Sequence, residues 1–148
     1  MLNKKAIVKK ISAIITGCIN QAQAEGCQKR FRELFDGEIV RAYQIARDHG
    51  WHDEERSDGE ILALIHSEVS EALQALREGN PPDKYCPEFS SLEVELADVI
   101  IRIMDYAGSR DLDIAGAILA KMEFNKNRPY KHGKAFRTKK QLEFNWIF

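Results

Sequence analysis

The sequence has few of the residues that cross-link a chain, and it has no long apolar run. Three cysteines occur among 148 residues, Cys18, Cys27 and Cys86, without a C-x-x-C arrangement. This excludes a disulfide framework and favours reduced thiols. No run approaches the ~18 apolar residues of a membrane span, and the apolar segment 11–16 is too short for a signal peptide. We therefore expect a cytoplasmic protein with no membrane association.

An excess of charge of one sign is also lacking. Lys and Arg together number 22 and Asp and Glu together number 23, for a net charge of −1. This balance gives no global basic field of the kind that attracts a nucleic-acid polymer. The hydrophobic content of 44% is that of a folded protein rather than a disordered one. At this length the sequence predicts one domain, 1–148, with a core of its own.

Proline and glycine are sparse, and they separate stretches with helical periodicity. Three of the four prolines fall at 81, 82 and 87, and no stretch shows the two-residue alternation of a strand. A break is expected near Gly26. The expected helices are 4–24, 33–48, 58–78, 89–108 and 112–127. The sequence therefore predicts an all-α fold, a bundle of four to five helices.

Local signals mark the ends of several of these helices. Ser57 with Glu60, and Ser90 with Glu93, have the spacing of a capping box, in which each side chain bonds the backbone of the other. Asp111 is expected to cap the last helix. The helix stops are glycines, at positions 50, 79 and 108.

Two acidic pairs stand inside otherwise apolar helices. Glu68 and Glu71 lie in H-S-E-V-S-E, and Glu95 and Asp98 lie in E-L-A-D. Carboxylates that converge between two helices repel one another unless cations neutralise them. Oxygen ligands suit a hard cation such as Mg²⁺, and the i,i+3 spacing lets one helix supply two ligands. The pattern predicts a metal site between two central helices; the alternative is a solvated face with ion pairs.

The apolar residues around these pairs suggest which faces are buried. On the 58–78 helix a wheel places the acids inside or beside the apolar arc. That arc consists of Ile61, Leu62, Ile65, Val69, Ala72, Leu73 and Leu76. The 89–108 helix is apolar nearly all round, which predicts burial, and its polar strip also holds Arg102 and Asp105. Two such helices have few partners in a short chain, which favours oligomerisation.

Basic and aromatic residues provide candidate contacts for a phosphorylated ligand. Lys121, Asn125 and Arg128 have the spacing of one helix face and would suit a polyphosphate; alternatively, they complement the helix dipole. Trp51 would stack on a base, with His52 or Gln44 hydrogen-bonding it, or would anchor packing. Tyr130 would likewise contact a sugar or close the bundle.

Together these residues resemble a known superfamily. E68-V-S-E71, E95-L-A-D98 and the segment K-M-E-F-N-K-N-R-P-Y-K-H-G-K-A-F that begins at Lys121 are similar to the all-α nucleoside triphosphate pyrophosphohydrolases. These include MazG proteins, dCTP pyrophosphatases, dimeric dUTPases and phosphoribosyl-ATP pyrophosphohydrolases. The resemblance covers 33–136, leaving 1–30 as an amino-terminal extension and 137–148 as a tail.

The resemblance implies a homodimer or homotetramer that uses Mg²⁺ or Mn²⁺ to hydrolyse a nucleotide to its monophosphate and pyrophosphate. The implied metal ligands and catalytic residues are Glu68, Glu71, Glu95 and Asp98, with Glu68 the better candidate to orient the attacking water. Lys121, Asn125, Arg128, Tyr130 and Trp51 would bind the substrate. Some relatives carry an additional Glu where this chain has Ser67, which leaves the number of metals open.

The resemblance leaves three functions open. The first is clearance of non-canonical or surplus (deoxy)nucleotides. The second is phosphoribosyl-ATP hydrolysis in histidine biosynthesis, which uses the same fold. The third is a non-catalytic helical interaction module, in which the acids form ion pairs with Arg102 and its neighbours.

Overall fold

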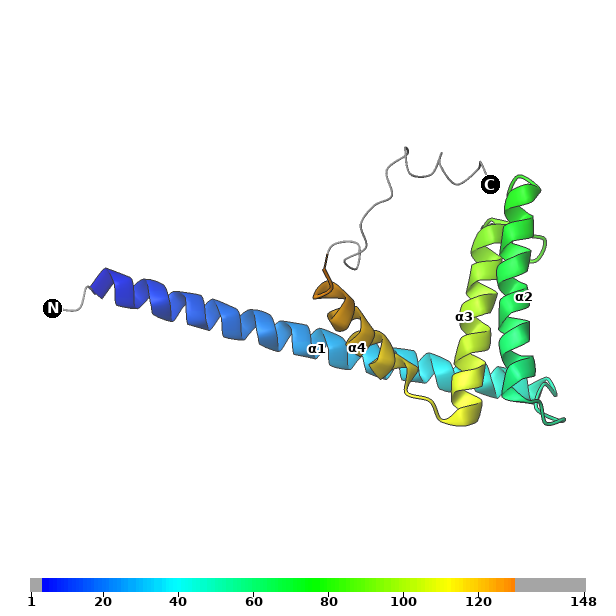
Figure 1. Ribbon diagram of the computed structural model, residues 1–148, viewed down its shortest axis with the longest axis horizontal. Coiled ribbons are helices and arrows are strands. Elements are labelled where there is room, and N and C mark those ends of the chain that lie inside the picture. The colour runs from blue at the N-terminus through cyan, green and yellow to red at the C-terminus, as the bar shows by residue number, and fades with distance from the viewer. Residues whose placement is uncertain (1–3, 130–148) are drawn as a thin grey trace, which may run out of the picture. The chain divides into compact units, whose positions relative to one another are not determined.

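The computed structural model describes residues 4–129, and within 4–22 it describes only some of the side chains. It contains four helices there, α1 (Lys4–Asp48), α2 (Asp58–Arg77), α3 (Ser91–Arg110) and α4 (Ile114–Lys126), and no strand (Figure 1). The predicted all-α fold is confirmed. The chain divides between Ala115 and Gly116 into two compact units, and each is described by itself.

The first helix differs from the expectation. Residues 4–48 form one continuous helix of 45 residues, so the break expected near Gly26 was wrong. A glycine inside a helix costs only about 0.5–1 kcal/mol, and its neighbours Ala24, Glu25 and Gln28 are tolerant of helix. None of the helices in the described part of the chain is long and apolar enough to cross a membrane.

The second and third helices form an antiparallel hairpin (Figure 1). Both predicted capping boxes are present, Ser57 with Glu60 and Ser90 with Glu93. In the connection, Gly79 and Asn80 adopt positive φ angles of 85° and 52°, which reverses the chain after α2. The Asn80 side chain then accepts a hydrogen bond from Leu92 N at 3.0 Å. The loop thus begins α3 at a fixed place beside α2.

The end of α3 was predicted incorrectly. The helix continues past Gly108 to Arg110, and Asp111 follows it with φ 53° and ψ 47° as its carboxyl-terminal cap. Asp and Asn adopt this left-handed conformation more readily than other residues with a side chain. Asp111 therefore ends α3, whereas the sequence had suggested that it begins the last helix.

Small residues bring α3 against the carboxyl-terminal part of α1. Ile39 and Ala42 of α1 and Ala107 of α3 are buried. Gly108 leaves space for the Tyr43 side chain, because a Cβ atom added at position 108 would lie 2.7 Å from Tyr43 Cβ. The α1–α3 contact therefore depends on the absence of a side chain at position 108.

Replacing Gly108 with Ala is expected to destabilise the protein by about 1–3 kcal/mol, the usual cost of overpacking. Gly37 is the matched control, since it lies inside α1 with nothing within 4 Å of an added Cβ. Gly37→Ala should stabilise the protein by up to about 1 kcal/mol through helix propensity. Urea unfolding of both variants measures the difference. Equal effects of the two substitutions would contradict the close α1–α3 contact.

The apolar arc expected on α2 is buried only in part. Ala72 and Ala75 are buried, whereas four larger residues of α2 are 45–53% exposed. These are Leu62, Val69, Leu73 and Leu76. The third helix is also less buried than expected, because Leu96, Ile100 and Ile101 are 46–51% exposed. The buried face of α2 is instead centred on Glu68, which is 6% exposed.

Candidate metal and nucleotide site

Glu68 is the one buried charged residue in the described part of the chain. It shares the buried face of α2 with Ala72 and Ala75, whose small side chains allow α3 to approach closely. Arg102 of α3 donates a hydrogen bond from Nε to Glu68 Oε1 at 2.5 Å. A buried carboxylate without a partner would be strongly destabilising, so this ion pair explains how the charge is tolerated between the helices.

Three carboxyl groups from the two helices come together. Glu68, Glu71 and Glu95 each place one oxygen so that all three atoms lie within 4.8 Å of one another. Their burial differs, since Glu71 is exposed and Glu95 is intermediate. Among the side chains that the structure describes, none forms an ion pair with Glu71 or Glu95. Three of the four predicted metal ligands therefore converge.

The electrostatics of this cluster reflect crowding of like charges. Desolvation is the main cause that raises the pKa of Glu95, followed by the charges of Glu71, Asp98 and Glu68. A raised carboxyl pKa means that the ionised form is disfavoured. Three converging oxygen donors whose charges repel are the donor set that suits a hard divalent cation. The residues present therefore fit a divalent metal such as Mg²⁺.

Asp98, the fourth predicted ligand, lies near the cluster but is not one of the three mutually close carboxyl groups. Desolvation raises its pKa, as does the charge of Glu68, while the charge of Arg102 lowers it. The charges of Glu68 and Arg102 thus both act on the Asp98 carboxyl group. It belongs to the side of the site that Arg102 occupies.

A cavity of about 640 Å³ adjoins two of these acids, Glu68 and Asp98. Its lining comes from the end of α1, the loop that follows it, and the facing sides of α2 and α3, and it includes Glu68, Asp98 and Arg102. The volume is in the range of small-molecule sites. Glu68 and Asp98 contribute carboxyl groups to the part of the wall formed by α2 and α3. Trp51 and His52 contribute aromatic rings from the loop between α1 and α2.

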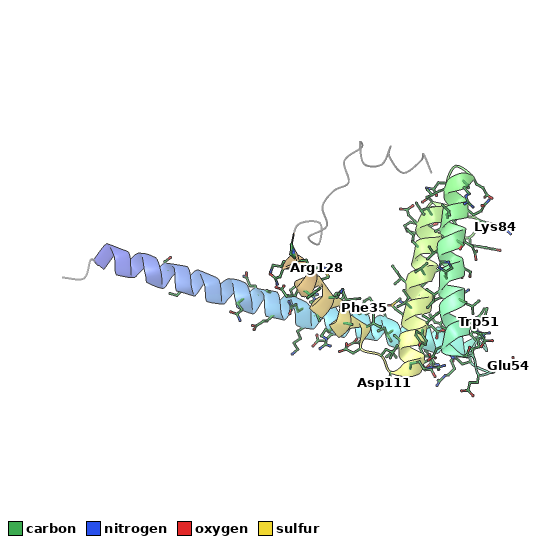
Figure 2. The ribbon with its side chains drawn as sticks, viewed as in Figure 1. Phe35, Trp51, Glu54, Lys84, Asp111 and Arg128 are labelled. Carbon is green, nitrogen blue, oxygen red and sulfur yellow. The ribbon has the colours of Figure 1, made fainter. Side chains whose placement is uncertain are left out.

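Trp51 lies in the wall of this cavity, in the loop between α1 and α2 (Figure 2). Its side chain is 51% exposed, and the Arg56 guanidinium carbon lies 5.2 Å from its ring centroid. Cation–π contact of this kind orients an exposed ring. The position is compatible with the predicted base contact, which stays a prediction.

The cavity also contains a polar pair that connects the loop to α3. His52 Nε2 lies 2.7 Å from Asp105 Oδ1, and the His52 ring packs edge-on against Tyr43 at 4.9 Å between centroids. His52 was predicted as a base contact and Asp105 only as a member of the polar strip of α3, and the two were not paired because 53 residues separate them. The spacing of Asp98, Arg102 and Asp105 along one strip of α3 was the available signal.

The predicted phosphate-binding residues lie in the second unit. Asn125 and Arg128 are brought together, since Arg128 Nη1 donates to Asn125 Oδ1 at 3.4 Å. Lys121 and Arg128 both lie over the Phe124 ring, at 4.9 and 5.4 Å from its centroid. All are exposed. Tyr130 lies outside the described residues.

Comparison with known proteins gives one curated relative. The human (Homo sapiens) dCTP pyrophosphatase 1 is 29% identical over 104 residues, which cover 68% of this chain and 61% of that protein. The chain thus spans about three fifths of the length of this relative. No family model matches the sequence, and no solved structure matches it. The chain is therefore similar, at a distance, to one of the enzyme types that its motifs resemble.

Proposed function

We propose that the protein is a MazG-like nucleoside triphosphate pyrophosphohydrolase, a divalent-metal-dependent enzyme that clears non-canonical or surplus (deoxy)nucleotides. The observation that carries the proposal is the convergence of Glu68, Glu71 and Glu95 from two helices beside a cavity large enough for a nucleotide. The similarity to a dCTP pyrophosphatase supports the same reaction class.

The proposed reaction is attack of water on the α-phosphorus of the substrate. The bond between that phosphorus and the α,β-bridging oxygen breaks, so that a monophosphate and pyrophosphate leave. When bound, Mg²⁺ or Mn²⁺ lowers the pKa of coordinated water and neutralises phosphate charge. Glu68, whose carboxylate is held by Arg102, would orient the water. Glu71, Glu95 and Asp98 complete the proposed metal-binding set.

Substrate contacts follow from the proposal. Trp51, half exposed in the cavity wall, would stack on the base; Tyr130, the predicted sugar contact, lies outside the described residues. In the second unit, taken by itself, Lys121, Asn125 and Arg128 are the proposed phosphate contacts, since a guanidinium binds phosphate oxygens in a bidentate manner. These three residues are exposed and carry cationic and amide groups on neighbouring positions, which is what binding a polyphosphate requires.

The proposal predicts release of pyrophosphate from at least one member of a panel of canonical and modified nucleoside triphosphates in the presence of Mg²⁺. Phosphoribosyl-ATP belongs in the same panel, because turnover of that compound alone would identify the biosynthetic enzyme instead. Failure to cleave any compound, with protein shown to be folded by circular dichroism, would contradict the proposed activity.

One observation favours the non-catalytic alternative, the ion pair between Arg102 and Glu68. An interaction module of this kind predicts that the acids are neutralised by basic side chains. Glu71 and Glu95, however, have no ion-pair partner among the described side chains. The ion pair at Glu68 therefore accounts for one acid of the cluster, and under the proposal Glu71 and Glu95 bind the metal.

We also propose that a second copy of the chain covers the exposed apolar stripe of α2. The stripe consists of Leu62, Val69, Leu73 and Leu76. Their spacing of seven, four and three residues places them on one face of the helix. The face points away from Glu71 on the helical wheel, so that pairing leaves the acids accessible. A symmetric dimer or tetramer can bury such a stripe against itself. Light scattering should give at least twice the chain mass, and a monomer at micromolar concentration would contradict this.

A further inference from the structure

The amino-terminal half of α1 contains basic residues and no acidic ones. Residues 4–24 carry four of the chain's 22 basic residues, Lys4, Lys5, Lys9 and Lys10, and none of its 23 acidic residues. The first acidic residue of the chain is Glu25. The segment is thus strongly positive, whereas the whole chain has a net charge of −1. A basic segment in an otherwise balanced chain indicates an anionic partner, such as a membrane surface or a nucleic acid.

The large aliphatic residues of the same segment share one face of the helix. Because residues 4–48 are helical, the spacing in the sequence determines which positions lie on one side. At about 100° per residue, all the isoleucine and valine positions of the segment fall within an arc of about 140°. These are Ile7, Val8, Ile11, Ile14, Ile15 and Ile19. Lys5, Lys9 and Lys10 fall outside this apolar arc, on both sides of it, and Lys4 is the first residue of the helix. An apolar arc bordered by lysines is typical of a helix that lies in a membrane interface.

Among the side chains that the structure describes, none covers this part of α1. Ile15, near the centre of the apolar arc, is 53% exposed, and all of residues 23–30 are exposed. A Cβ atom added at Gly17 or at Gly26 would have nothing within 4 Å. The apolar arc is therefore accessible at Ile15 to a partner outside the chain.

A second copy of the helix fits the apolar arc less well than a membrane does. A coiled-coil seam through Ile7, Ile11 and Ile14 would continue through Gln21 and Glu25, and these two exposed side chains hydrogen-bond each other at 3.0 Å. The apolar seam thus ends within about two heptads, whereas a coiled coil is indicated by three or four. The lysines of two paired helices would also repel one another. A wide apolar arc with four lysines and no acid instead fits an interface that is both apolar and anionic.

We propose that residues 4–22 of α1 bind the surface of a membrane that contains anionic lipids. The apolar arc lies at the boundary of the acyl chains, and the lysines lie at the level of the headgroup phosphates. A surface helix needs no membrane-spanning length, so the lack of a long apolar run in the sequence does not exclude this mode of binding. The proposal is independent of the proposed nucleotide chemistry, because it uses no residue of the cavity or of the acidic cluster.

Sedimentation of the full chain with lipid vesicles tests the proposal. The wild type should bind vesicles of phosphatidylcholine that contain about one-third phosphatidylglycerol, and should bind pure phosphatidylcholine more weakly. Replacing Lys5, Lys9 and Lys10 together with Gln should lower the partition coefficient on the anionic vesicles by about fivefold for each lysine removed. The control is Lys29→Gln, because Lys29 lies past the segment and pairs with Glu33 at 3.9 Å, and this variant should bind as the wild type does.

A matched pair of substitutions separates insertion of the apolar arc from loss of charge. Ile15→Asp places a carboxylate inside the arc, and Thr16→Asp places one on the polar side, about 100° further round the helix. Both substitutions change the charge of the segment equally, so the electrostatic loss is the same. Ile15→Asp should bind the anionic vesicles about tenfold more weakly than Thr16→Asp, because it also removes an apolar side chain from the acyl-chain boundary. Circular dichroism should show that both variants are folded.

Failure of the folded wild type to bind the anionic vesicles would overturn the proposal, and a halved mass of Ile15→Asp in light scattering would then assign the arc to a second copy. Equal binding by Ile15→Asp and Thr16→Asp would also overturn it, since attraction by charge alone, as for a nucleic acid, does not need the isoleucines. If either Asp variant does not fold, undiminished binding by the triple Gln variant would overturn the proposal and weakened binding would support it. None of these results concerns nucleotide hydrolysis, which is tested separately.

Discussion

Replacing Glu71 with Gln is expected to lower the turnover of any cleaved nucleotide by about 10²–10³-fold, the loss seen when one electrostatic group of an active site is removed. Gln keeps the shape of the side chain and removes the charge, so that the close group formed with Glu68 and Glu95 loses one anionic ligand. Steady-state pyrophosphate release at saturating Mg²⁺ measures the effect.

The stability of the same variant distinguishes a lost ligand from a damaged fold. The charge of Glu71 is, after desolvation, the main cause that raises the pKa of Glu95. Removing it relieves repulsion, so that the metal-free variant should be at least as stable as the wild type. Glu78→Gln is the control, because Glu78 caps the carboxyl-terminal end of α2, seven residues after Glu71, and accepts a hydrogen bond from Gln74. Full activity in Glu71→Gln would exclude Glu71 as a metal ligand.

Much of the fold followed from local signals in the sequence. The two capping boxes begin α2 and α3 where the spacing of Ser and Glu indicated, because those bonds form within one turn of chain. The continuity of α1 through Gly26 was not predictable in the same way. The unfavourable helix propensity of one glycine is smaller than the summed favourable propensity of its neighbours. A lone glycine is therefore a poor predictor of where a long helix ends.

The candidate site was predictable to the extent that it depends on helix periodicity. The i,i+3 acids of α2 and α3 come together as expected, apart from Asp98. Periodicity did not reveal that Glu68 is the centre of the buried face, while Leu73 and Leu76 are exposed. That depends on where α3 packs, which the buried alanines and the Arg102 ion pair determine. Contacts between residues far apart in sequence, such as His52 with Asp105, leave no local signature.

Mg²⁺ is expected to stabilise the protein by about 2.7 kcal/mol at a free concentration 100-fold above its dissociation constant, and this stabilisation should grow as the pH rises. The pKa values of Glu95 and Asp98 are raised, first by desolvation and then by neighbouring carboxylates. The metal-free folded chain therefore binds more protons at these groups than the unfolded chain does. Their contribution to stability falls as the pH rises from the ordinary carboxyl pKa through the raised value.

Metal binding reverses this dependence of stability on pH, because the carboxyl ligands must be ionised to bind the ion. The difference between unfolding free energies with and without Mg²⁺ should thus be small near the ordinary carboxyl pKa and reach its full value above the raised pKa of Glu95 and Asp98. Taking this difference cancels the effect of three other carboxyl groups, Glu60, Asp83 and Glu93, whose pKa values are lowered by hydrogen bonds. Thermal unfolding across this pH range provides the measurement. An unchanged melting temperature at neutral pH would favour the non-catalytic helical module, in which the acids need no metal.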